Sequence, residues 1–302
     1  MTHTSKTIVF FGTDEFSAAS LRELIAKGFT IGAVVTKPDS QKGRGRALTK
    51  SIVKQIAEAN NIPVWQPLRV DALAEHIEKL TVHGNKPIGV LVSYGRIISQ
   101  PIIDLFEPGI VNVHPSLLPL YRGPSPIESA ILHGDTETGV TIMQLSKAMD
   151  AGPIYSQVTV PLLDIETAPE LETQLAELGA QELSLTLPAI INGTVKPTPQ
   201  DDSVATYCQL LTKQDSHLDT SLLTAEQAER RVRAYLAFPK SKVTVSGHQI
   251  VITKAHVTNT HASPLDIPCA DGRFLSIDEL IGPSGKSMNA AAFLNGYAGK
   301  NK

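Results

Sequence analysis

Residues 110–119 read IVNVHPSLLP, a short run of β-branched side chains with a polar residue at every second position. Side chains alternate across a strand, so Asn112 and His114 lie on one face and the valines between them on the other. Pro115 has no N–H to give to a ladder and therefore ends the strand. The stretch predicts a buried strand that carries an amide and an imidazole at its carboxyl end.

Apolar runs of the same type recur through the first half of the chain, at residues 7–11, 30–35, 88–93, 140–145 and 154–160. Helical patterns accompany them, at residues 14–27, 51–59, 71–80, 101–106 and 170–191. This alternation predicts an α/β domain over residues 1–195, a Rossmann-like and mostly parallel sheet with helices on both faces. Open sheets of this kind bind ligands at the carboxyl edge. Asn112 and His114 are therefore candidate site residues, and a structural pair that only satisfies its own hydrogen bonds is the alternative.

The composition changes near residue 196. Residues 196–205 are rich in proline and polar side chains and are expected to form a linker. Beyond them, one helical pattern at residues 225–237 precedes strand-like runs at residues 242–245, 249–257 and 274–281. Residues 206–302 are therefore expected to form a smaller β-barrel, OB-like domain.

Bulk composition excludes several classes of protein. Hydrophobic residues make up 42% of the 302 residues and charged residues 19%, as in a globular protein with a substantial core. No run approaches the roughly 20 apolar residues that span a bilayer, and the polar N-terminus does not resemble a secretory signal. The two cysteines are typical of a reducing compartment. We expect a cytoplasmic, monomeric protein without a membrane partner.

Charge is distributed unevenly between the two halves of the chain. Residues 1–205 hold 16 basic and 22 acidic residues, whereas residues 206–302 hold 11 and 8. The excess of positive charge in the second half indicates a polyanionic partner, although counts this small also arise by chance.

A second polar cluster follows the predicted strand at residues 140–145. It reads KAMDAG over residues 147–152, and it places Asp150 in a loop between two strands. A loop carboxylate is by itself most often a solvated turn former.

Taken together, the stretches NVHPSLLP (112–119), YRG (121–123), GVT (139–141) and DAG (150–152) resemble the 10-formyltetrahydrofolate-dependent formyltransferase family. The resemblance implies formyl transfer from 10-formyltetrahydrofolate without a metal. It implies that Asn112, His114 and Asp150 are the catalytic residues. It also implies a set of folate contacts at Tyr94, Gly95, Ile97, Ser116, Leu117, Leu118 and Pro119.

The resemblance extends over nearly the whole chain and is strongest to members that formylate the methionine carried by initiator tRNA. KPD at residues 37–39, GRGR at 43–46 and ATY at 205–207 resemble those members. It implies that Lys42, Arg44 and Arg46 contact the tRNA, although a charged run is often only a solvated face. Leu120, Thr220 and Phe238 depart from the family pattern.

Two other functions compete with this interpretation. The same chemistry can act on a small amine, such as glycinamide ribonucleotide or an amino sugar. A non-catalytic RNA-binding protein on this scaffold belongs to a different class. The basic loop and the β-rich second domain argue against the small amine, and the intact set of Asn112, His114 and Asp150 argues against the silent protein.

Overall fold

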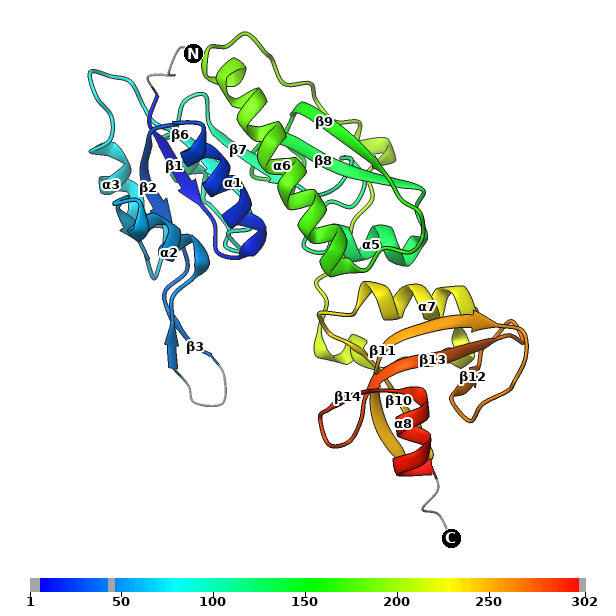
Figure 1. The fold of residues 1–302 in the computed structure, drawn as a ribbon. Helices are drawn as coiled ribbons and strands as arrows, with labels where there is room; N and C mark the ends of the chain where they lie inside the picture. Colours follow the sequence, from blue (N-terminus) through cyan, green and yellow to red (C-terminus); the bar gives the residue numbers. More distant parts are fainter. Residues whose placement is uncertain (1–5, 43–46, 299–302) are drawn as a thin grey trace. The chain divides into compact units, whose positions relative to one another are not determined.

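The computed structural model describes residues 6–42 and 47–298, which form two compact units (Figure 1). The first unit joins Met1–Gly123, Thr138–Val160 and Glu172–Tyr207. The second joins Pro124–Glu137, Pro161–Leu171 and Cys208–Lys302.

The first unit is built on a seven-stranded sheet with the strand order β5-β2-β1-β6-β7-β8-β9. Its strands are β1 (Ile8–Phe11), β2 (Ile31–Val35), β5 (Val64–Trp65), β6 (Ile88–Leu91), β7 (Ile110–His114), β8 (Glu137–Gln144) and β9 (Ile154–Pro161). The pairs from β5 to β7 are all parallel, and β8 runs antiparallel to β7. The mostly parallel sheet predicted from the alternating pattern is confirmed.

Helices cover both faces of this sheet. They are α1 (Glu15–Ala26), α2 (Ile52–Ala59), α3 (Ala74–Glu78), α4 (Gln100–Ile103) and α6 (Ala168–Ile191). On one face, Ile110 of β7 packs in a core with Ile77 of α3 and Ile102 of α4. On the other, Val113 lies against Gly179 of α6, where a Cβ would approach its side chain to 2.8 Å. Asn112 and His114 share the face of Ile110, because alternate residues of a strand point the same way.

The second unit contains a five-stranded antiparallel sheet with the order β10-β11-β13-β12, and β14 pairs with β13. The strands are β10 (Ser241–Val245), β11 (His248–Thr258), β12 (Asp266–Pro268), β13 (Phe274–Ile281) and β14 (Ser287–Asn289). Helix α7 (Ala225–Ala234) begins at a capping box of Thr224 and Gln227 and packs its Ala228 and Val232 into the core. Helix α8 (Ala290–Phe293) adds Phe293 to that core. A separate β-rich C-terminal part was predicted and is observed.

Three features were not predicted. A helix from the middle of the chain, α5 (Pro126–His133), belongs to the second unit, where it packs on α7. Strands β3 (Ser40–Lys42) and β4 (Ala47–Thr49) pair as a hairpin. The segment expected to be a linker, residues 196–205, groups with the first unit, and Thr198 forms a β-bridge with Ile154 of β9. Among the described residues, no helix combines the length and apolar character that a membrane span requires.

Candidate active site

Strand β7 delivers two polar side chains to the carboxyl edge of the sheet. Asn112 and His114 are both buried, and β6 and β8 flank the strand that carries them. The Nε2 of His114 lies 3.0 Å from the main-chain oxygen of Tyr121. Because a carbonyl oxygen only accepts, Nε2 carries a proton, and in the neutral ring Nδ1 holds the lone pair.

The Nδ1 of His114 faces Asp150, the carboxylate that the sequence placed in the loop after β8. Nδ1 and Oδ2 are 3.9 Å apart, which is longer than a hydrogen bond. Asp150 Oδ2 accepts a hydrogen bond of 2.9 Å from the main-chain N–H of Gly123. Asp150 adopts a φ of +47°, a left-handed conformation that costs free energy for a residue with a Cβ. The structure therefore brings together His114 and Asp150 from separate parts of the sequence.

The Asn112 side chain differs from its neighbours in having no hydrogen-bond partner within residues 6–42 and 47–298. Its amide atoms are not among the fully buried side-chain atoms that lack a partner, so they remain accessible. Two donors and an acceptor thus remain available at the edge of the sheet, beside His114.

The turn after β7 is tied down by Thr141 of β8. The Thr141 hydroxyl donates to Ser116 O at 2.6 Å and accepts from Leu118 N at 3.2 Å. The Ser116 hydroxyl donates in turn to Leu120 O at 2.6 Å. Gln157 of β9 donates to Leu118 O at 2.8 Å. The hydroxyl of Ser116 and the main-chain N and O of Leu118 are consequently used by the protein itself, and the Leu118 side chain is buried, whereas Leu117 and Pro119 are only half-buried.

The other three predicted folate contacts lie on the neighbouring loop after β6. Tyr94 is fully buried and packs edge-on against Phe11, with ring centres 5.6 Å apart. Burial raises the pKa of Tyr94. Gly95 has a φ of +69° and lies against the amine of Lys37, and Ile97 is 91% exposed. Gly95 and Ile97 are therefore accessible to a ligand, and the Tyr94 ring belongs to the core.

In the sequence, the predicted tRNA contacts fall at the end of β3 and between β3 and β4. Arg44 and Arg46 lie outside the described residues, as does the side chain of Lys42. At the base of the hairpin, Lys54 Nζ contacts Asp39 Oδ2 at 2.7 Å and Gln66 Oε1 at 2.7 Å. Hydrogen bonding from Lys54 lowers the pKa of Asp39. Lys54 therefore anchors the hairpin rather than offering its charge to a ligand.

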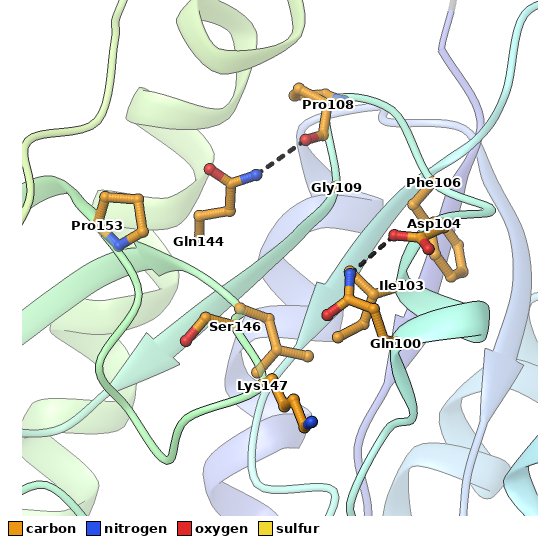
Figure 2. A pocket seen from close by; sticks show the side chains of 11 residues that line it. Gln100, Ile103, Asp104, Phe106, Pro108, Gly109, Gln144, Ser146, Lys147 and Pro153 are labelled. Carbon is orange, nitrogen blue, oxygen red and sulfur yellow. Dashed lines mark hydrogen bonds between the residues drawn. The ribbon is translucent and has the colours of Figure 1, made fainter.

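A cavity of about 440 Å³ opens at the opposite end of β7 from His114 (Figure 2). Gln144 reaches across it to donate to Pro108 O at 3.0 Å, and Gln100 donates to Asp104 on its other side. Ile103, Phe106 and Leu145 supply apolar lining. None of the predicted catalytic or folate residues is among the lining residues of this cavity.

Sequence reasoning missed Arg122 and Gln200. The Gln200 amide donates to the main-chain oxygens of Asp150 and Gly152, at 2.8 and 2.7 Å, and the buried Arg122 guanidinium donates to Gln200 Oε1. Gln200 was placed in a linker, and a contact across 50 residues leaves no local pattern by which it could be found. Within the described ranges, no group of three or more His, Cys, Asp or Glu side chains is arranged to hold a metal ion.

Comparison with known proteins gives matches over both parts of the chain. Residues 5–187 match a family model described as formyl transferase, and residues 210–298 match one described as formyl transferase, C-terminal domain. The chain belongs to the formyl transferase family. A relative from Pelobacter propionicus named methionyl-tRNA formyltransferase is 37% identical over 304 residues, which cover 97% of this chain and 93% of the relative.

Solved structures of two other proteins share the fold. An N-formyltransferase from Helicobacter canadensis, in complex with folinic acid and dTDP-3-aminofucose, matches with a TM-score of 0.66 at 20% identity, covering 90% of this chain and 98% of its own. HypX from Aquifex aeolicus in complex with tetrahydrofolic acid matches with a TM-score of 0.67 at 16% identity, covering 97% of this chain and 47% of its own. At identities of 20% and 16%, the similarity shows a shared fold and does not by itself establish a function.

Proposed function

We propose that this enzyme transfers a formyl group from 10-formyltetrahydrofolate to the α-amino group of the methionine on initiator tRNA. The observation that supports this acceptor is the 37% identity to the Pelobacter propionicus methionyl-tRNA formyltransferase, which runs through both units of the chain. The role would place the protein in the cytoplasm with the translation machinery.

We assign formyl transfer to the carboxyl end of β7, where Asn112 and His114 lie. The acceptor amine must be neutral to attack, and a free α-amino group has a pKa of about 7.7–8.0 that the adjacent ester lowers further. Attack on the formyl carbon places negative charge on the formyl oxygen. The amide of Asn112, which has no partner among the described residues, can donate to that oxygen as an oxyanion hole does.

Proton transfer belongs to His114 and Asp150. A new C–N bond forms to the amine, the bond to N10 of the folate breaks, and one proton must pass from the first nitrogen to the second. Because Tyr121 O engages Nε2, the nitrogen that can take up this proton is Nδ1 of His114. Asp150 would stabilise the resulting imidazolium, and a shift of about 1 Å would bring the pair within hydrogen-bond range, as commonly happens when a substrate binds.

The folate would bind beside this edge, where residues of suitable type are accessible. Ile97 and the half-buried Leu117 and Pro119 offer apolar contact, and Gly95 lets a ligand approach the main chain. The Ser116 hydroxyl is hydrogen-bonded within the protein, and the side chains of Leu118 and Tyr94 are buried, so these three residues would shape the wall of the folate site rather than offer it free polar groups. We propose that Lys42, Arg44 and Arg46 attract the phosphates of the tRNA.

The small-amine alternative draws support from the solved N-formyltransferase bound to an amino sugar nucleotide. The deciding experiment offers the purified protein labelled 10-formyltetrahydrofolate and, in parallel, charged initiator methionyl-tRNA, glycinamide ribonucleotide and a nucleotide-linked amino sugar. We expect label on the methionyl-tRNA and little on the small amines. Preferential formylation of a small amine would reject the proposed acceptor, and transfer to none of them would favour a silent RNA-binding protein.

A further inference from the structure

Residues 200–207 run alongside the catalytic turn. Thr206 N donates to Pro119 O at 3.2 Å, and Arg122 N donates to Thr206 O at 2.9 Å. The Thr206 hydroxyl accepts from Tyr121 N at 2.8 Å. Tyr121 is the residue whose carbonyl engages His114, so this segment is hydrogen-bonded to both sides of the residue that holds the imidazole.

From the start of this segment, Gln200 reaches into the loop of Asp150. Its Nε2 donates to Asp150 O at 2.8 Å and to Gly152 O at 2.7 Å. Both protons of one amide are thereby used on two carbonyls of the same short turn. A carboxylate could not make these two bonds, since it has no proton to donate.

Arg122 determines which way that amide points. Its guanidinium is 2% exposed, and Nε and Nη2 donate to Gln200 Oε1 at 3.0 and 2.8 Å. Asp202 and Tyr207 accept further bonds from it, at 2.7 and 3.2 Å. An arginine can only donate, so Oε1 of Gln200 must face it and Nε2 must face the loop. The orientation of the amide therefore follows from the chemistry of its neighbours.

The loop needs such support because its backbone is strained. Asp150 has a positive φ of +47°, and a conformation of this kind persists only where its surroundings impose it. Gly152 is pressed against Gln144 O, where a Cβ would come within 1.8 Å. The carboxylate is tethered at Gly123 N, and the peptide behind it is tethered by Gln200.

We propose that Gln200, oriented by Arg122, is a positioning residue that sets the distance between Asp150 and His114. This inference rests on the catalytic role proposed for Asp150. It assigns the segment after α6 a part in positioning the proposed catalytic groups. A displacement of about 1 Å at such a group can cost roughly 100-fold in rate.

The test replaces Gln200 with glutamate. Arg122 favours the ionised form of the new carboxylate, which keeps the acceptor for Arg122 but faces the carbonyls of Asp150 and Gly152 without a proton. A second variant, Gln200→Met, removes the donors without adding charge. Asn60→Asp is the matched control, because Asn60 likewise donates its amide to a main-chain oxygen, at 2.8 Å, but does so at the end of α2. Formyl transfer to charged methionyl-tRNA gives kcat and the KM for the folate, and urea unfolding reports stability.

We expect Gln200→Glu to lower kcat by about tenfold to 100-fold, with the folate KM changed by less than about threefold. Gln200→Met should also lower kcat, by a smaller factor, and Asn60→Asp should have the kcat of the wild type. In an Asp150→Ala background, Gln200→Glu should cause no further loss, because residues that act as a unit are not additive.

Three results would overturn the proposal. Wild-type kcat in both Gln200 variants, with or without a loss of stability, would make the contact merely structural. If Gln200→Glu lowered kcat by the same factor in the wild-type and Asp150→Ala backgrounds, Gln200 would act independently of Asp150. Full activity of Asp150→Ala alone would remove the proposed catalytic role of Asp150 and the inference with it, whereas a dead Asp150→Ala beside active Gln200 variants would remove only the inference.

Discussion

The family resemblance implies two site residues, Asn112 and Tyr94, whose side chains lie in different surroundings in the structure. Asn112 is buried without a hydrogen-bond partner among the described residues and is therefore ready to bind a ligand. Tyr94 is buried in the core, and its hydroxyl is also unpaired within that part of the chain. The difference is that Asn112 lies at the edge where His114 and Asp150 meet, whereas the Tyr94 ring packs on Phe11.

Removing the Tyr94 hydroxyl should therefore stabilise the protein. An unsatisfied buried donor costs about 1–3 kcal/mol, so Tyr94→Phe is expected to raise the free energy of unfolding by about 1 kcal/mol. Folate affinity should stay the same, because the hydroxyl points into the core. Urea unfolding and folate titration measure both quantities, with Tyr155→Phe as the control at a half-buried tyrosine. A weaker folate complex without a gain in stability would place the hydroxyl in the binding site instead.

Individual elements are joined by ion pairs that the sequence pattern did not reveal. Asp164, in the segment between β9 and α6, accepts from Arg230 and Arg233 of α7 at 2.6 and 2.7 Å. The hydrogen bond from Arg230 lowers the pKa of Asp164 below its ordinary value of 3.8, against the opposing effect of burial. This contact fastens the segment to α7 within the second unit.

Asp164→Asn should therefore weaken the protein only where the carboxyl is ionised. Asn also tolerates the φ of +58° found at this position. Because Asp164 is 44% exposed, its pairs contribute at most about 1 kcal/mol at neutral pH. A lowered folded-state pKa means that this stability is present above pH 4 and is lost as the pH falls through the folded-state value. Measurements of the free energy of unfolding of both proteins from pH 7 downward should show a difference that narrows as the pH falls below 4; a difference that did not narrow in acid would contradict this account.

The basic hairpin should act through its charge. If Arg44 contacts a phosphate, Arg44→Ala should weaken tRNA binding and reduce the log–log salt slope by about one unit or slightly less. Folate affinity should not change. Lys79→Ala, which removes an exposed charge beside α3, is the control. Binding titrations at several salt concentrations measure the slope. An unchanged slope would show that Arg44 does not contact a phosphate and is only a solvated charge.

For the whole molecule, the sequence predicted the sheet and the position of Asn112 and His114 on one of its strands, but not how the chain is divided between units. Strands and the Asn112–His114 spacing follow from alternation, which is a local property. The place of α5 on α7 and the hydrogen bonds of Gln200 depend on contacts between distant residues, which no periodicity encodes. The residues of the basic hairpin could be named from their charge, but their positions lie outside the described chain.

This division predicts how truncated chains behave. A chain that ends at Tyr207 keeps Asp202 and Tyr207 as hydrogen-bond partners of the buried Arg122 guanidinium, whereas one that ends at Gln200 loses these two partners. Removing a partner of a buried charge costs about 3 kcal/mol. The free energy of unfolding of the shorter chain should therefore be lower than that of the longer one by about this amount. Both should be less stable than the full chain, because α5 has lost α7. Equal urea midpoints for the two fragments would show that residues 201–207 do not support the first unit.

The central claim is that the edge formed by Asn112, His114 and Asp150 carries out formyl transfer. The most direct test is the single-turnover rate of formyl transfer from 10-formyltetrahydrofolate to charged initiator methionyl-tRNA by His114→Ala. We predict a fall of about 100- to 1,000-fold, as for the loss of a group that acts mainly in the transition state, with folate affinity unchanged. A rate within about threefold of the wild type would contradict the assignment of the active site to this edge.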